Sequence, residues 1–224
     1  MLVIAMETGS DGQVRWAGSR HDDDRPDASS GTSPAELFDA VFHALHDGEQ
    51  VALGFDCPLT MPVSPETDPG SAPADAETDA LVTLAEPASS RPGLAELGYL
   101  LSELGMWRPW TTVSTSLARW KANTSILVWQ AVPAPGANAI TASAAATSFF
   151  RQLPAVTSRA TEPATGTAPA AATEPATGTA PATGTEPAAA TVVNLAAAAA
   201  RRAGLFVDPC ELAQPAVSIT VTAG

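Results

Sequence analysis

The sequence predicts an α/β fold in which a mixed β-sheet is flanked by helices within one domain. Three observations lead to this prediction. Segments with helical spacing of apolar residues alternate along the chain with short apolar runs that are typical of strands. One of these runs, VALGFD, shows no alternation of apolar and polar residues, which indicates a strand covered on both faces. The segment before it carries clear start and stop signals for a helix, and a helix followed by a buried strand is half of an α/β unit.

The chain is predicted to begin with a β-hairpin. LVIAME at 2–7 and VRWAG at 14–18 are strand-like runs, and the turn-rich TGSDGQ joins them. The polar, acidic segment 20–33 is predicted to be a surface loop, with a weak third strand as the alternative.

A helix is predicted from Pro34 to just before Gly48. Ser33 stands at the N-cap and Glu36 three residues later, which is a capping box, and proline at the first helical position presets the first turn. The apolar residues that recur at helical spacing are Leu37, Phe38, Val41, Phe42 and Leu45.

The rest of the chain continues this alternation around two segments of low complexity or irregular composition. From apolar spacing we predict a strand at 50–56, helices at 91–105 and 140–153, a strand at 124–132, an Ala-rich helix at 192–205 and a final strand at 216–223. Residues 61–91, rich in Pro, Ser and acidic residues, are predicted to form an irregular loop.

A low-complexity insert at 155–191 divides the predicted domain into residues 1–154 and 192–224. TEPATGTAPA begins at Thr161 and again at Thr173, so the period is 12 residues. Repeats of Ala, Thr, Pro and Gly supply little apolar surface, which predicts a solvated linker or expanded loop.

Composition limits the function classes. The chain of 224 residues has a formal net charge of −13 and a pI near 4.4, so it repels phosphate backbones at long range unless a local basic patch or a metal ion intervenes. We interpret Cys57 and Cys210 as reduced thiols, and with no apolar run of membrane-spanning length and no signal peptide we expect a cytoplasmic protein without membrane contacts. Serine-hydrolase elbows and nucleotide-binding glycine loops are not present in the sequence.

Two predicted strands end in an acidic residue, the first in Glu7 and the buried run at 50–56 in Asp56. If these strands are neighbours, both carboxylates emerge at one edge of the sheet. Hard oxygen ligands of this kind suit Mg²⁺ or Mn²⁺, and paired ions can drive phosphodiester hydrolysis. The alternative is that both acids only form turns, since an Asp at a strand exit that leads into a turn commonly bonds its own backbone.

The chain resembles the ribonuclease H-like superfamily, and within it a family of uncharacterised predicted nucleases. The resemblance rests on VIAMETG with the VRWAG hairpin, LGFDCPLTMP, RPWTTVSTSLARWKANTSILVWQA and VVNLAAAAARRAGL, which together touch most of the non-repetitive chain. It implies a ribonuclease H-like mixed sheet and a metal-dependent nuclease in which acids of the first strand, the fourth strand and the last helix hold the metal ions.

Carried over by position, the resemblance implies Glu7 and Asp56 as catalytic metal ligands and Asn194 at the third catalytic position. Asn194 stands where the resemblance implies an acid or sometimes a histidine, and Gln130 stands where a strand residue could have been Glu. An amide carries no charge, so binding of two ions is expected to be weaker. Asp208 and Glu211 could compensate only if the segment after the last helix folds back.

Residues 106–130 combine four tryptophans with the few basic residues of this acidic chain. Aromatic rings beside cations suit single-stranded nucleic acid, so we predict Arg108, Trp110, Arg119 and Lys121 as substrate-binding residues. The alternative is that the tryptophans are core anchors and the arginines reach past them to solvent.

Two functional hypotheses therefore stand. The first is a nuclease dependent on Mg²⁺ or Mn²⁺ that acts on nucleic acid, with activity weakened or lost through Asn194 and Gln130. The second is a non-catalytic interaction module that keeps the ribonuclease H-like fold. The sequence does not determine the substrate or the oligomeric state.

Overall fold

A computed structural model of the chain describes residues 1–9, 13–20, 27–62, 92–123, 125–136, 140–160 and 192–222. Most of the predicted loop at 61–91 and most of the low-complexity insert lie outside the described residues. The elements in chain order are β1 (Leu2–Thr8), β2 (Val14–Arg20), β3 (Asp27–Gly31), α1 (Pro34–His46), β4 (Val51–Phe55), β5 (Thr60–Pro62), α3 (Pro92–Trp107), β6 (Val113–Ser114), α4 (Leu117–Asn123), β7 (Ile126–Pro133), α5 (Ala142–Ala160), β8 (Val192–Asn194), α6 (Leu195–Arg202), the 3₁₀ helix η2 (Pro209–Ala213) and β9 (Ser218–Val221).

The main sheet is mixed, as the sequence predicted. Its strand order is β3-β2-β1-β4-β7-β6, and β9 also pairs with β7. Strands β1, β2 and β3 pair antiparallel, whereas β1, β4, β7, β6 and β9 are joined by parallel pairs. Strands β5 and β8 form a separate antiparallel ribbon.

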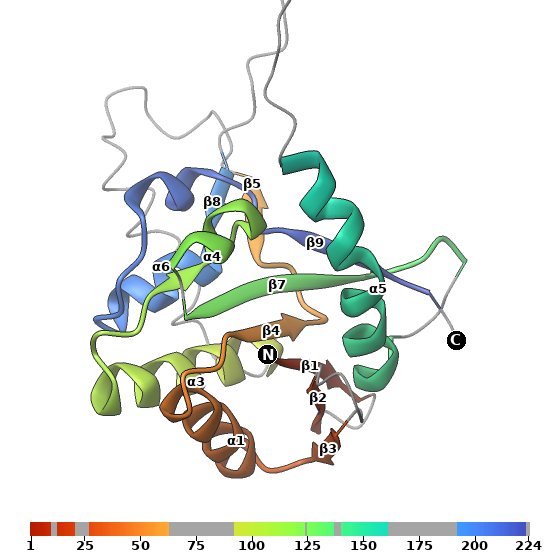
Figure 1. The fold of residues 1–224 in the computed structure, drawn as a ribbon, viewed down its shortest axis with the longest axis horizontal. Coiled ribbons are helices and arrows are strands. Elements are labelled where there is room, and N and C mark those ends of the chain that lie inside the picture. The colour runs from red at the N-terminus through yellow and green to blue at the C-terminus, as the bar shows by residue number, and fades with distance from the viewer. Residues whose placement is uncertain are drawn as a thin grey trace, which may run out of the picture.

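Helices cover both faces of the sheet (Figure 1). Leu53 and Phe55 belong to the core cluster under α1, α3 and α6, whereas Ala52 belongs to the cluster under α4 and α5. Every residue of β4 is buried, which confirms the prediction that this strand is covered on both sides.

Several boundaries differ from the sequence predictions. The alternative of a weak third strand within 20–33 is the one that the structure has, as β3. The predicted helix at 140–153 continues to Ala160 and so takes the first residues of the predicted insert. The helix predicted from Val192 begins at Leu195 instead, because the β-branched Val192 and Val193 pair with β5 before the chain turns into the helix. Strands β5 and β6 and helix α4 were not predicted.

Within the described residues, no helix combines the length and the apolar character that crossing a bilayer requires.

Candidate functional site

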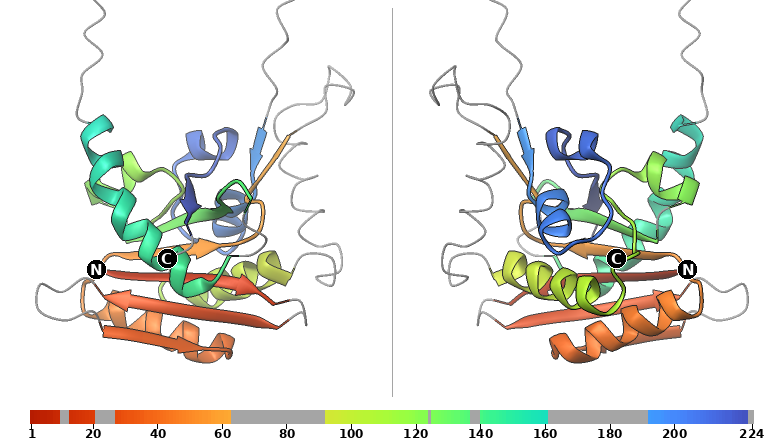
Figure 2. Two further views of the ribbon diagram at one scale, coloured as in Figure 1. Left: turned by 90° about the vertical axis from the view of Figure 1, so that its right-hand side faces the viewer. Right: turned by 90° about the vertical axis from the view of Figure 1, so that its left-hand side faces the viewer.

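The end of β1 and the end of β4 bring Glu7 and Asp56 to the same edge of the sheet. The two strands are parallel neighbours, and Met6 pairs with Phe55 in the register, so the next residue of each strand is one of the two acids. Figure 2 shows both strands running toward this edge. The juxtaposition that the sequence predicted for these two residues is therefore present in the backbone.

Glu7 lies against the first turn of α5. Its Oε2 accepts a hydrogen bond from the backbone N–H of Ala142 at 2.8 Å, and its Oε1 is 3.9 Å from a guanidinium nitrogen of Arg15 on the neighbouring strand. Because the N-terminus of a helix carries a partial positive charge, this position stabilises a carboxylate.

Asp56 lies against the first turn of α3. Its Oδ2 accepts a hydrogen bond from the backbone N–H of Thr8 at 2.6 Å, which ties the end of β4 to the end of β1. A Cβ atom added to Gly93 would lie 3.5 Å from Oδ1 of Asp56 and 3.0 Å from Sγ of Cys57, so glycine permits the close approach of α3 to this turn. Each of the two acids thus lies beside the start of a helix.

Gln130 belongs to the same edge. It pairs with Phe55 in the register of β4 and β7, and its Oε1 accepts a hydrogen bond from the backbone N–H of Leu59 at 3.3 Å. This bond holds the turn that follows Asp56. The amide of Gln130 therefore has a structural partner, the backbone N–H of Leu59.

Asn194 is fully buried and caps α6. Its Oδ1 accepts a hydrogen bond from the backbone N–H of Ala197 at 3.1 Å, and its Nδ2 donates to Oγ1 of Thr115 at 2.8 Å and to the backbone oxygen of Gln214 at 2.9 Å. Both ends of the amide have protein partners. The geometry thus explains Asn194 as a helix cap, and lends no support to its predicted place as the third catalytic residue.

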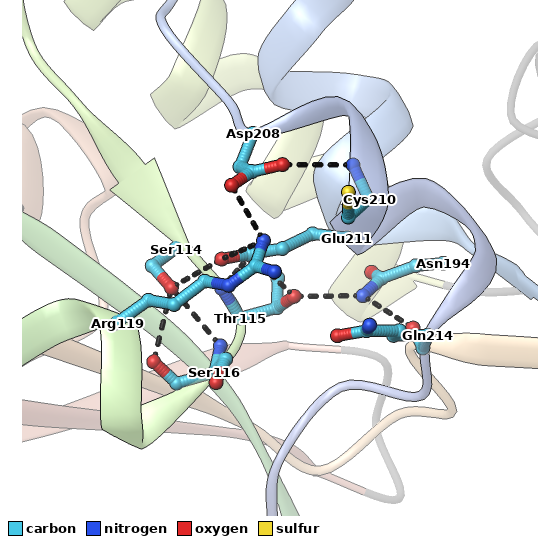
Figure 3. Close-up of polar contacts among 9 residues, drawn as sticks. All are labelled: Ser114, Thr115, Ser116, Arg119, Asn194, Asp208, Cys210, Glu211 and Gln214. Atoms are coloured by element: carbon cyan, nitrogen blue, oxygen red, sulfur yellow. Dashed lines mark hydrogen bonds and ion pairs between the residues drawn. The ribbon is translucent and has the colours of Figure 1, made fainter.

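The segment after α6 does fold back, but Glu211 and Asp208 do not join Glu7 and Asp56. Glu211 is 1% exposed, and its carboxylate accepts hydrogen bonds from the hydroxyls of Ser114 (2.6 Å) and Thr115 (2.8 Å) and from the backbone N–H of Thr115 (Figure 3). Asp208 pairs with Arg119 at 2.7 Å. The described structure therefore does not support the possibility that Asp208 or Glu211 replaces the missing third metal ligand.

The buried carboxylate of Glu211 binds the backbone at a break in the edge of the sheet. Strand β6 pairs with the first half of β7 and β9 with the second half, so the edge changes strands next to Thr115. The backbone oxygen of Thr115 accepts a hydrogen bond from Val217, just before β9, while its N–H donates to Glu211. The carboxylate thus satisfies a buried backbone donor where the ladder is interrupted.

The predicted substrate-binding residues are not gathered at the Glu7–Asp56 edge. Arg119 is engaged with Asp208, and lies 3.9 Å from a carboxylate oxygen of Glu211. Arg108 and Trp110 follow the far end of α3, and the rise of this helix separates them from Asp56 by about 20 Å. Lys121 lies in α4, and its side chain is outside what the structure describes.

The core-anchor interpretation holds for two of the four tryptophans of this segment, and the other two are exposed. Trp120 and Trp129 are buried and pack on Phe149, as core anchors do. Trp107 and Trp110 are 63% and 79% exposed. Helix α4 and strand β7 place their tryptophans inward, whereas the end of α3 and the turn after it point theirs to solvent.

The Asp208–Arg119 pair predicts a pH dependence of stability. The pKa of Asp208 is lowered from its ordinary value of 3.8, chiefly by the hydrogen bond from the backbone N–H of Cys210 and further by the Arg119 guanidinium. A lowered pKa in the folded state contributes stability above pH 3.8 that is lost as the pH falls through the lowered value. Asp208→Asn is therefore expected to lower the urea midpoint at pH 7 and to approach wild type as the pH falls below 3.8. A loss that is constant across this pH range would contradict the assignment.

Comparisons with protein-family models, with curated proteins and with solved structures found no match for this chain.

Proposed function

We propose that the edge formed by Glu7 and Asp56 holds a divalent cation and that the protein is a metal-dependent nuclease of ribonuclease H-like type. The observation that carries the proposal is the parallel pairing of β1 with β4, in which Met6 lies opposite Phe55, so that the backbones of the two acids are adjacent at one end of the sheet. Two carboxylates at adjacent strand ends are a suitable start for a site for Mg²⁺ or Mn²⁺.

The ribonuclease H-like assignment is supported by the positions of the acids in the sheet. Glu7 lies on the first strand, and Asp56 directly follows the fourth strand in chain order. These are the first two positions that the sequence resemblance implies for metal-binding acids. The pairing of β1 with β4 brings the backbones of the two acids together, which supports the proposal that they share a cation.

The residues present fit one hard cation better than two. The backbone N–H of Ala142 engages Oε2 of Glu7 and that of Thr8 engages Oδ2 of Asp56. A cation would therefore bind Oδ1 of Asp56 and Oε1 of Glu7, and at Oε1 it would replace the guanidinium of Arg15, which lies 3.9 Å away. No group of three His, Cys, Asp or Glu side chains suited to a metal occurs among the described residues. Magnesium is commonly bound by one or two carboxylates with water and substrate phosphate completing the shell.

In this proposal the two acids hold the cation, and the two backbone donors orient the acids. A bound Mg²⁺ or Mn²⁺ would polarise the phosphoryl group and lower the pKa of bound water. The starts of α5 and α3, which cover opposite faces of the sheet, lie beside Glu7 and Asp56 respectively, and each favours negative charge there.

A second candidate function is the non-catalytic interaction module. It is favoured by Asn194, whose side chain caps α6 at the position where the resemblance implies a third acid. It is also favoured by the hydrogen bonds that Glu7 and Asp56 already make to backbone N–H groups. In this case the carboxylates hold the sheet to its helices and bind no ion.

The proposal is tested by thermal unfolding with and without Mn²⁺. At a metal concentration of tenfold the Kd, binding to the folded state adds about 1.4 kcal/mol and raises the melting temperature by about 3–5 °C. Glu7→Gln and Asp56→Asn are expected to abolish this rise, because each removes one of the two carboxylate ligands. Asp39→Asn, an exposed acid on α1, serves as the matched control and should keep it.

Hydrolysis of a labelled single-stranded oligonucleotide in the presence of Mn²⁺ then separates the two candidates. Cleavage that is lost in Asp56→Asn supports the nuclease. A melting temperature that does not respond to millimolar Mn²⁺, or responds equally in all four proteins, would overturn the metal site and favour the interaction module.

A further inference from the structure

The ends of α3 and α6 meet at a corner of the molecule far from Glu7 and Asp56. A Cβ atom added to Gly105 would collide with the backbone oxygen of Ala203, so the two helix ends are in backbone contact. The backbone N–H of Phe206 donates a hydrogen bond to the backbone oxygen of Thr111 at 3.1 Å. The backbone oxygen of Phe206 accepts a hydrogen bond from the N–H of Val113 at 2.8 Å. The chain after α3 and the chain after α6 therefore run together at this corner, on the left of Figure 1.

Large aromatic side chains are exposed at this corner. Trp107 is 63% exposed, Trp110 is 79% exposed and Phe206 is 62% exposed, and Met106 beside them is 66% exposed. The indole N–H of Trp107 donates to Glu103 one turn earlier at 3.3 Å, which orients that ring on the helix surface. Exposed apolar groups gathered in one place mark an interaction site more often than singly scattered ones do.

The same corner is basic, although the chain as a whole carries a formal charge of −13. Arg201 and Arg202 are exposed at the end of α6, and the guanidinium of Arg108 lies 5.9 Å from the centroid of the Phe42 ring. Along 101–110 and 195–207 the sequence contains one acid, Glu103, which is the partner of Trp107, and the next acid along the chain, Asp208, is paired with Arg119. Charge complementarity therefore favours an anionic partner and disfavours a second copy of this acidic chain.

We propose that this aromatic–arginine corner, made of Trp107, Trp110, Phe206, Arg108 and Arg202, binds single-stranded nucleic acid. Unpaired bases present ring faces that stack on indole and phenyl groups, and arginine meets the phosphates between them. An acidic peptide would satisfy the arginines but would leave the ring faces without flat partners. The proposal does not depend on metal binding at Glu7 and Asp56, because the corner lies at the opposite end of α3.

The test is fluorescence anisotropy of a fluorescein-labelled oligothymidylate of about 12 nucleotides, a length within the usual site size for single-strand binding. Wild type is expected to bind it at low salt, with the logarithm of the binding constant falling by about 1.4 per logarithm of salt concentration if Arg108 and Arg202 each meet a phosphate. Trp110→Ala is expected to weaken binding about tenfold with the salt slope unchanged, because it removes stacking and no charge.

Arg202→Gln is expected to reduce the salt slope by about 0.7, because it removes one phosphate contact. Arg151→Gln, which changes an exposed arginine of α5 on the other face of the sheet, is the matched control and should bind as wild type does. Both changes at the corner affect exposed side chains, and far-ultraviolet circular dichroism of each variant verifies that the fold is kept.

Three results would overturn the proposal. The first is no binding of the oligothymidylate at low salt, or binding that Trp110→Ala and Arg202→Gln leave unchanged. The second is tighter binding of a poly-glutamate peptide than of the oligothymidylate, which would assign the corner to acidic proteins. The third is a dimer in sedimentation that Trp110→Ala dissociates, which would assign it to a second copy of the chain.

Discussion

Glu211→Ala is expected to lower the free energy of unfolding by about 3–5 kcal/mol, a larger loss than we expect from any other acid of the described structure. The carboxylate is buried and accepts hydrogen bonds from two hydroxyls and from the backbone N–H of Thr115. Its removal leaves that N–H without an acceptor at the break between β6 and β9. It also leaves Arg119 with one acidic neighbour instead of two. The measurement is urea unfolding followed by circular dichroism.

Glu211→Gln is expected to lose less than Glu211→Ala. Its side-chain oxygen can still accept from Thr115, and its NH₂ group can face Ser114, whose hydroxyl has the backbone oxygen of Ser116 as another acceptor at 3.0 Å. Asp39→Ala, at an exposed position on α1, is the control and should change stability by less than about 0.5 kcal/mol. Equal stabilities of the two Glu211 variants and wild type would show that this carboxylate does not hold the sheet break together.

Gly54→Ala is expected to destabilise the protein by about 3 kcal/mol or to prevent folding. Gly54 pairs with Trp129 across β4 and β7, and a Cβ atom added to it would collide with Cζ2 of the indole. The indole is fully buried, and its ring centroid lies 5.1 Å from that of Phe149 on α5, so it cannot move without displacing the helix side of the core. Urea unfolding, or the yield of folded protein, measures the effect.

Two variants control this prediction. Gly98→Ala, in the middle of α3 with no atom within 4 Å of the new Cβ, should raise stability by up to about 1 kcal/mol through helix propensity. In a Trp129→Leu background the smaller side chain should make Gly54→Ala much less harmful than it is in wild type. If Gly54→Ala costs the same in both backgrounds, contact with the indole is not the cause.

Local signals predicted much of the fold. The capping box at Ser33 and the apolar spacing after it predicted α1, whose Ser33 side chain does accept a bond from the backbone N–H of Glu36. The unbroken apolar run before Asp56 predicted a strand covered on both faces. Short elements such as β5, β6 and β8 escaped prediction, because two or three residues carry no period and take their form from the strands beside them.

The candidate site was predicted in part. The ends of two predicted strands indicated Glu7 and Asp56 as site residues, and the pairing of β1 with β4 places their backbones together. The sequence did not predict that Asn194 caps a helix, that Arg119 pairs with Asp208, or that Glu211 is buried. The only sequence signal for the first was an Asn directly after two β-branched residues and before an Ala-rich run, which is a preferred N-cap residue at a strand-to-helix change.

The amino-acid sequence by itself determined the types of the longer elements, the two acids at strand ends and the acidic character of the chain, since these depend on residues close together or on simple composition. Only the tertiary structure decided which distant side chains became neighbours, as with Thr115 and Glu211, 96 positions apart. Closing a loop costs free energy that grows only slowly with its length, so separation along the chain says little about contact in space. The packing of the elements determines those contacts. It therefore also determines whether a polar group bonds to the protein itself or stays accessible to a ligand.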